Sequence, residues 1–249
     1  MVKNGAPRDD RLLPERIGRV GMISLSLRRF TLCGLSALVV ALAVAPVARA
    51  AKVDVLPPQS KPFGLTYGQW SAEWWKQAVR QTGAAGTPFA AGAVSCSSMG
   101  TGDVVFLVGT TPAVSPAVER SCTISKHAAV LLPAINAECS QAEDNGSTDA
   151  ELRACATSLA DKFTNVHVVV DGRALSGLSA FRFASPLYLF SPVAGNVFGI
   201  RAAVNSPSVA DGYWVMLDKL KKGTHTVSFG GEAPAFGFVT ETTYTLTVR

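Results

Sequence analysis

A cluster of carboxylates after position 137 has the residue types and the spacing that acid–base catalysis would need. Glu138 follows an apolar run, and Glu143 and Asp144 lie within the next six residues. Two carboxylates about 5 to 10 Å apart supply the acid and the base or nucleophile of a glycosidase. Glu138 with Asp144 or Asp211 is the pair that this chemistry would use. A loop of oxygen ligands could also bind calcium, but the spacing matches no known calcium loop.

Motifs for other catalytic classes do not occur in the sequence. The three histidines, His127, His167 and His225, have no local metal-ligand spacing, and no G-x-S-x-G elbow is present. His225 shares its parity with the apolar residues of the following strand, which predicts a core-facing, hydrogen-bonded histidine. Gly230-Gly231 predicts a turn between strands rather than a phosphate-binding loop. We therefore expect no metal and no cofactor.

The first fifty residues have the pattern of a secretory signal peptide. Arg28-Arg29 precedes a mostly apolar run over 32–44, and Pro46 and the triplet Ala48-Arg49-Ala50 follow it. This order predicts a leader over residues 1–50 with cleavage after Ala50. Residues 1–21 are polar and charged, so translation is expected to start at Met22. The protein is then exported, to the periplasm or the medium.

A membrane anchor is the alternative interpretation of this segment. The uncharged stretch over 30–48 has 19 residues, close to the minimum that spans a bilayer. Pro46 and the alanine-rich end favour cleavage instead, so no membrane span is expected in the mature protein. The residues around Arg28-Arg29 fit a twin-arginine signal poorly, which favours ordinary secretion.

Removal of the leader changes the charge of the chain. The full sequence has 23 Lys and Arg and 18 Asp and Glu, of which residues 1–50 hold eight and three. The mature part, residues 51–249, therefore carries 15 of each and is formally neutral. Net charge gives no support to a nucleic acid or another polyanion as partner.

Four cysteines remain in the mature part, and an even number in an exported chain favours two disulfides. Three pairings are possible, and we favour the two that close short loops. In the chain-entropy model each such loop contributes about 3 kcal/mol. No two cysteines are spaced as zinc ligands usually are. The favoured pairs are Cys96 with Cys122 and Cys139 with Cys155.

A tryptophan-rich amphipathic helix is predicted near the start of the mature part. Thr66 and Gln69 have capping-box spacing, and Trp70, Trp74 and Trp75 fall on one broad apolar face. Burial of such a face would anchor the helix on a sheet, and Trp75 should be its most buried tryptophan. Trp70 lies nearer the polar boundary and is the one expected to be exposed, where its indole face could stack on a sugar ring.

The rest of the mature chain is mainly strand-like. A second helix is predicted from the capping-box pair Thr148 and Glu151. About eight strands with tight turns and no βαβ rhythm indicate a single antiparallel β-sandwich or jelly-roll-like domain with two helices. The expected strands cover residues 104–108, 120–125, 128–132, 166–170, 178–183, 213–217, 224–229 and the alternating segment 236–248.

Four sequence blocks resemble a group of uncharacterised bacterial exported proteins that carry a YGxWSAxWW block. The resemblance covers most of residues 62–248 and implies export and a single domain, but no activity and no catalytic residues. Gln69 and Glu73 stand where relatives are expected to have Glu and Arg, so no ion pair is carried over. The blocks are Tyr67 to Trp75, Leu132 to Cys139, Asp211 to Leu217 and Gly223 to Gly231.

From these observations we expect an exported, disulfide-stabilised protein that binds a glycan or another component of the cell envelope without catalysis. A secreted hydrolase built on Glu138 and a second carboxylate is the alternative, and a structural or assembly role is a third. No catalytic residue is assigned. The residues expected to bind the ligand are Trp70, Asn136, Glu138, Tyr213 and His225.

Overall fold

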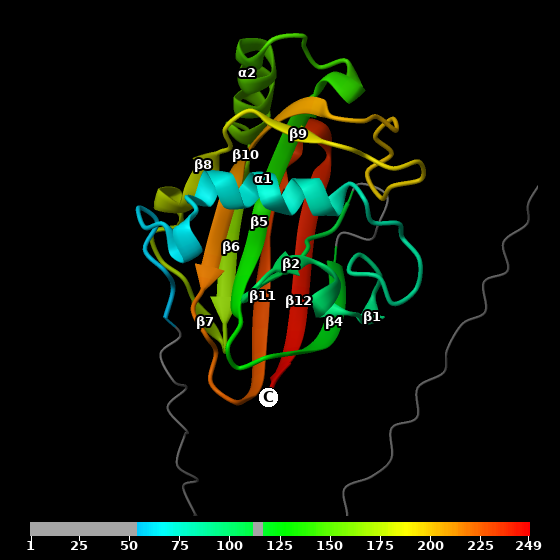
Figure 1. The fold of residues 1–249 in the computed structure, drawn as a ribbon. Helices are drawn as coiled ribbons and strands as arrows, with labels where there is room; N and C mark the ends of the chain where they lie inside the picture. Colours follow the sequence, from blue (N-terminus) through cyan, green and yellow to red (C-terminus); the bar gives the residue numbers. More distant parts are fainter. Residues whose placement is uncertain (1–53, 112–116) are drawn as a thin grey trace, which may run out of the picture. The chain divides into compact units, whose positions relative to one another are not determined.

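Two β-sheets form the framework of the computed structural model, which describes residues 54–111 and 117–249 (Figure 1). All of these residues belong to one compact unit. The first sheet has the order β1 (Gly92–Ala93), β4 (Ala117–Ile124), β12 (Phe238–Val248), β11 (Gly223–Ala233), β6 (Thr164–Val170) and β7 (Arg173–Ala174). The second has the order β2 (Gly100–Thr101), β3 (Val104–Phe106), β5 (Ala129–Ser140), β10 (Ser206–Leu217) and β8 (Arg182–Ala184), with β9 (Tyr188–Phe190) also on β10.

The mainly β architecture with two helices is confirmed, and both sheets are mixed. Most neighbouring strands run antiparallel, but β4 pairs in parallel with β1 and β12, and β3 pairs in parallel with β5. Parallel pairs need longer connections than hairpins, so the strand order could not be read from the turn signals alone. The predicted leader, its cleavage point and the start at Met22 concern residues outside the described part.

The pair β5 and β10 is the central ladder of the second sheet and is covered on both faces. Leu131, Leu132, Val215 and Met216, from both faces of the two strands, are all completely buried. The helix α1 (Tyr67–Ala78) crosses one face of β5 and β10 (Figure 1), and the first sheet packs on the other. Strands buried on both faces have continuous apolar sequences instead of an alternating pattern.

The helix α1 forms where its capping box predicts. The Thr66 side chain accepts a hydrogen bond from the Gln69 amide, and the Gln69 side chain accepts one from the Thr66 amide. All three helix tryptophans are buried: Trp70 is 3% exposed, Trp74 2% and Trp75 5%. The indole of Trp70 donates to the Pro62 carbonyl at 2.9 Å. The prediction that Trp70 is the exposed tryptophan is therefore wrong, because the chain before the helix folds over it.

The second helix, α2 (Asp149–Ala160), also begins at its predicted capping box, formed by Thr148 and Glu151. It packs on β5 and β10. The disulfide Cys139–Cys155 joins it to β5, and the disulfide Cys96–Cys122 joins the first sheet to the segment before β2. Both favoured cysteine pairings are confirmed. In the described part of the chain, no helix is long and apolar enough to cross a membrane.

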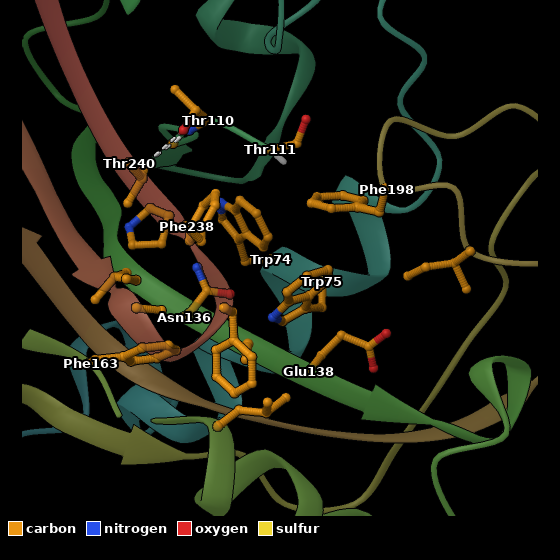
Figure 2. A pocket seen from close by; sticks show the side chains of 18 of the residues that line it. Trp74, Trp75, Thr110, Thr111, Asn136, Glu138, Phe163, Phe198, Phe238 and Thr240 are labelled. Carbon is orange, nitrogen blue, oxygen red and sulfur yellow. Dashed lines mark hydrogen bonds between the residues drawn. The ribbon is translucent and has the colours of Figure 1, made fainter. Parts of the chain in front are cut away.

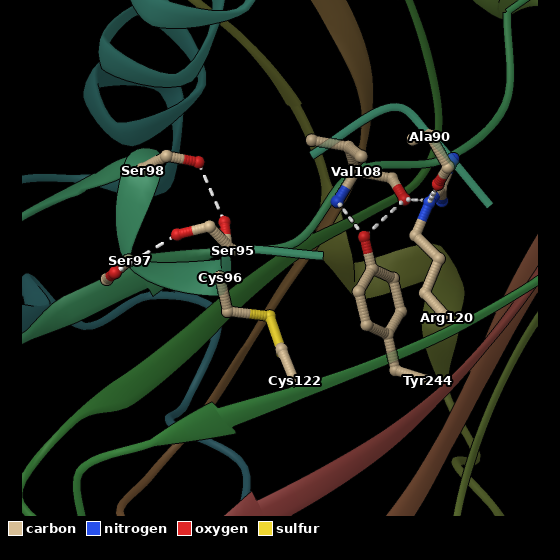
Figure 3. The surroundings of a disulfide bond; sticks show 9 residues. All are labelled: Ala90, Ser95, Cys96, Ser97, Ser98, Val108, Arg120, Cys122 and Tyr244. Atoms are coloured by element: carbon tan, nitrogen blue, oxygen red, sulfur yellow. Dashed lines mark hydrogen bonds between the residues drawn. A yellow bond between two sulfur atoms is a disulfide. The ribbon is translucent and has the colours of Figure 1, made fainter. Parts of the chain in front are cut away.

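The disulfide Cys96–Cys122 lies close to a buried arginine (Figure 3). Arg120 of β4 is 2% exposed. Its guanidinium lies over the Tyr244 ring at 5.6 Å and donates to the carbonyls of Ala90, Val108 and Phe89 at 2.7, 2.8 and 3.2 Å. One side chain thus satisfies three carbonyl groups of two loops that have no strand partners of their own, which ties both loops to the first sheet.

Two local predictions fail. The segment 178–183 is a 3₁₀ turn over Leu178–Phe181 before β8 rather than one strand. Gly230-Gly231 is not a turn but lies inside β11. A Cβ on Gly231 would lie 3.0 Å from Ile135 Cγ2, so the missing side chain lets β5 of the second sheet approach the first sheet closely.

Replacement of the buried arginine tests its structural role. Arg120→Met keeps the apolar stem but leaves the Ala90 and Phe89 carbonyls without donors and the Val108 carbonyl with the Tyr244 hydroxyl alone, so we expect the free energy of unfolding to fall by about 3 kcal/mol or more. Arg120→Lys, which keeps one charged donor group, should lose less. Urea unfolding of both variants and the unchanged chain measures the difference. Equal stability of Arg120→Met and the unchanged chain would contradict this role.

Candidate functional site

A cavity of about 290 Å³ opens at one end of the two sheets (Figure 2). Its walls come from the last turns of α1, from β5, from the start of β12 and from the loop after β3. Its residues are mostly apolar, as is usual for sites that bind small molecules. They include Trp74, Trp75, Phe89, Thr110, Thr111, Pro133, Ile135, Asn136, Ala137, Glu138, Glu143, Leu159, Phe163, Phe198, Ile200, Phe236, Phe238 and Thr240.

The course of β5 explains why the space exists at this place. On one side β5 pairs with β10 from Val130 to Ser140, but on the other it pairs with β3 only from Ala129 to Leu131. Beyond Leu131 the described residues include no strand next to this edge. Pro133 occupies the unpaired edge, where its missing N–H costs no ladder hydrogen bond. Side chains of both parities from Pro133 to Glu138 line the cavity, which therefore runs along the edge of the strand.

Aromatic rings form much of the wall. The rings of Trp74 and Trp75 meet edge to face with centroids 5.2 Å apart, and Phe198 lies 4.9 Å from Trp75. Phe89 contacts both Trp74 and Phe198. The indole of Trp74 donates to the Leu107 carbonyl at 2.8 Å, which fixes this side chain against the loop after β3. The aromatic wall is thus held in place by the fold without a ligand.

Three polar atoms of the cavity lining are buried and lack a hydrogen-bond partner among the described residues. They are Trp75 Nε1, Asn136 Oδ1 and Thr111 Oγ1. Buried polar groups in native proteins are almost always paired, and an unpaired one costs about 1–3 kcal/mol. Only two other buried side-chain atoms in the described part share this property, Trp214 Nε1 and Thr242 Oγ1. The unpaired groups therefore concentrate at the cavity.

The position of Asn136 depends on a glycine in the neighbouring strand. Asn136 lies opposite Gly212 in the β5–β10 ladder. A Cβ on Gly212 would lie 2.4 Å from Asn136 Cβ and 2.5 Å from its Cα, which is closer than such atoms can approach. Gly212 therefore allows Asn136 to occupy this position, and Figure 2 shows its amide facing the indole of Trp75.

Glu138 is the buried carboxyl of the cavity, with 8% of its surface exposed. Its carboxyl group accepts a short hydrogen bond from the Ser208 hydroxyl, which also hydrogen-bonds the Tyr188 hydroxyl at 3.0 Å. Burial, followed by the neighbouring Glu143 carboxyl, raises the pKa of Glu138 well above its ordinary value, against the hydrogen bonds from Ser208 and Ser140. Burial and the charge of Glu138 also raise the pKa of the Tyr188 hydroxyl.

The carboxylate that accompanies Glu138 is Glu143, and not Asp144 or Asp211 as the sequence predicted. The Ser140 hydroxyl lies 3.4 Å from Glu138 Oε1 and 3.1 Å from Glu143 Oε2, so it bridges the two groups. Asp144 instead forms an exposed ion pair with Arg201. Asp211 pairs with Arg182 at 2.9 Å. Neither Asp144 nor Asp211 lines the cavity.

Of the five residues predicted to bind a ligand, the structure brings Asn136 and Glu138 together in the cavity. Trp70 is buried in the core. Tyr213 is half-buried on β10, opposite Ile135 and Arg182, and does not line the cavity. His225 lies at the start of β11, far along the ladder from Thr240, with its ring nitrogens 2.8 Å from Asp171 Oδ2 and the Lys221 carbonyl.

Sequence reasoning missed Thr111 and the position of Trp75 at the cavity. It named Glu143 in the acidic cluster but did not pair it with Glu138. Only the mixed strand order brings the loop after β3 beside β12, and no local pattern shows this order. The prediction that Trp75 is the most buried tryptophan of the helix is wrong: it is 5% exposed, against 3% for Trp70 and 2% for Trp74, because it lies at the cavity. The residues of the described part include no group of three or more His, Cys, Asp and Glu side chains that could hold a metal ion.

No protein-family model and no curated protein sequence matches the chain. Among solved structures, the cysteine protease inhibitor EhICP2 from Entamoeba histolytica aligns with 58% of this chain and 96% of its own. The sequence identity is 14% and the TM-score 0.22. A TM-score this low carries no argument about fold or function, so the functional conclusion depends on the cavity itself.

The raised pKa of Glu138 predicts a specific pH dependence of stability. The native chain keeps a proton on this carboxyl at pH values where the unfolded chain has released it. The contribution of Glu138 to the free energy of unfolding therefore falls as the pH rises above 4.5, the ordinary pKa of a glutamate. Glu138→Gln removes this loss of stability, so the variant should become progressively more stable than the unchanged chain as the pH rises above 4.5.

Urea unfolding at several pH values tests this expectation, with Glu151→Gln as the control of opposite sign. Hydrogen bonds from Ser147 and Thr148 lower the pKa of Glu151 to about 2. Glu151 therefore stabilises the folded chain above pH 4.5, its ordinary pKa, and this stabilisation is lost as the pH falls toward 2. A stability difference between Glu138→Gln and the unchanged chain that stays constant with pH would show that Glu138 is not held protonated.

Proposed function

We propose that this protein is an exported, non-catalytic binding protein that takes one unit of a glycan of the cell envelope into the cavity beside β5. The observation that carries the proposal is the set of unpaired polar atoms within a preformed aromatic wall. Sugars present apolar C–H faces to aromatic rings and hydroxyl groups to polar atoms. A bound sugar would supply the hydrogen bonds that Trp75 and Asn136 lack.

The size and the charge of the cavity support a compact, uncharged ligand. Its volume of about 290 Å³ is near the lower end of the range for small-molecule sites. Its ionisable lining residues are Glu138 and Glu143, and none of the described lining residues is Lys, Arg or His. An anionic ligand would face carboxyl groups without a compensating cation. A neutral sugar has no such penalty.

The proposed contact surface differs from the stacking platform expected from the sequence. Trp70 is buried and is not available for stacking, whereas Trp74, Trp75 and Phe198 present rings to the cavity. Two disulfides are compatible with an oxidising compartment, which supports export to the periplasm or the medium. We also base the proposal of export on the resemblance of the sequence to bacterial exported proteins with a YGxWSAxWW block.

A hydrolase is the second candidate, and the carboxyl pair favours it. Glu138 has the raised pKa of a general acid, and Glu143 is bridged to it by Ser140. Retaining glycosidases hold two carboxyl groups about 5–5.5 Å apart. Release of a reducing end from a bound glycan, abolished by Glu138→Gln and by Glu143→Gln separately, would establish this activity. A bound glycan that is recovered intact would support binding alone.

The binding proposal predicts different effects for two tryptophans that both have unpaired nitrogens. Trp75 lines the cavity and Trp214 does not. The full chain with its disulfides formed should bind a subset of a glycan array. Trp75→Phe, which removes the N–H donor and keeps an aromatic ring, should weaken this binding about tenfold because one buried hydrogen bond is lost.

Trp214→Phe is the matched control and should retain binding, even if the smaller ring lowers the stability of the core. Circular dichroism checks that both variants are folded before affinity is compared. An equal loss of glycan affinity in Trp75→Phe and Trp214→Phe would indicate a general effect on packing. The absence of binding to every glycan on the array would overturn the proposed function.

A further inference from the structure

The unpaired atoms of Trp75 and Asn136 have complementary chemical requirements. The indole nitrogen of Trp75 can only donate a hydrogen bond, and the side-chain oxygen of Asn136 can only accept one. In Figure 2 the Asn136 side chain faces the Trp75 indole, yet no hydrogen bond joins the two atoms and neither has another partner among the described residues. A group that satisfies both must carry an acceptor and a donor at a fixed separation.

This requirement excludes most charged groups. A carboxylate accepts hydrogen bonds but cannot donate to Asn136, and it would lie near Glu138 and Glu143. An ammonium group donates but cannot accept from Trp75. A secondary amide meets both requirements at once, because its C=O accepts and its N–H donates in one rigid plane. A hydroxyl group can meet both only by directing its single proton to Asn136.

The surroundings of these two atoms favour an amide that carries a methyl group. Phe198 lies 4.9 Å from the Trp75 ring, and Phe163 also lines the cavity on the side of Asn136 (Figure 2). A methyl group buried between such rings contributes about 1 kcal/mol, whereas a hydroxyl group there would require a further partner. Amide and methyl together make an acetamido group.

We propose that the cavity selects an N-acetylated amino sugar and holds its acetamido group between Trp75 and Asn136. The inference rests on the proposed glycan binding and names the sugar class that the site prefers. The acetamido carbonyl accepts from Trp75 Nε1, the acetamido N–H donates to Asn136 Oδ1, and the methyl group contacts the aromatic wall. The sugar ring then extends from this group toward the opening of the cavity.

Titration of the full, disulfide-bonded chain with three monosaccharides tests the proposal by calorimetry. N-acetylglucosamine should bind at least tenfold more tightly than glucose, which lacks the acetamido group, and than glucosamine, which carries an ammonium group instead. Asn136→Leu and Trp75→Phe should each reduce the affinity for N-acetylglucosamine to about that for glucose. Thr242→Val, which removes an unpaired buried hydroxyl outside the cavity, should leave all three affinities unchanged.

Each other outcome overturns a defined part of this assignment. Equal affinity for glucose and N-acetylglucosamine would leave glycan binding intact and refute the acetamido contact. Tightest binding of glucosamine would show that the carboxyl groups select a cation instead. Selective binding of N-acetylglucosamine that survives both cavity substitutions would place the sugar at another site. Absence of binding to all three sugars, together with an array that shows no glycan bound, would remove the proposed function as well.

Discussion

The pairing of β5 with β10 is the constraint on which the rest of the structure depends. Both strands are buried on both faces, so their ladder must be covered by α1 on one side and by the first sheet and α2 on the other. The apolar side chains of this ladder supply the centre of the core. Because β3 follows β5 only as far as Leu131, the same strand that organises the core also has an uncovered edge. The cavity lies along that edge.

Most buried polar side chains in the described part of the chain have hydrogen-bond partners, and three of the five that lack one line the cavity. Arg120 and Trp70, outside the cavity, and Trp74, in its wall, are all buried, and each donates to one or more backbone carbonyls. In contrast, Trp75 and Asn136 each have a buried side-chain atom without a hydrogen-bond partner. The fold thus provides hydrogen-bond partners for the buried side chains of Arg120, Trp70 and Trp74, but not for these two atoms. Three of the five unpaired groups in the described part lie in one cavity, and this concentration is the reason why we propose the cavity as the binding site.

Much of the local structure could be predicted from short sequence patterns. Both helices begin at predicted capping boxes, since a threonine followed three residues later by Gln or Glu satisfies helix-end amides locally. The alternating segment at the end of the chain forms β12, one face of which is buried. The strand β5 was predicted to end at Leu132 but continues to Ser140. A strand buried on both faces has no alternating pattern that marks its end. Of the five residues that the sequence predicted to bind a ligand, Asn136 and Glu138 line the cavity, and their role in binding stays a prediction.

The sequence by itself determined the helix starts and the mainly β class, because each depends on residues near one another in the chain or on simple parity. It favoured the observed cysteine pairs but left three pairings possible. Only the tertiary structure decided which strands run in parallel, that Trp70 is covered, and that Glu143 rather than Asp144 joins Glu138. These outcomes depend on segments far apart in the chain. The loop after β3 meets β12 about 130 residues later, where Thr110 and Thr240 are hydrogen-bonded, and both residues line the cavity. Such contacts arise from the packing of whole sheets, for which no local pattern is diagnostic.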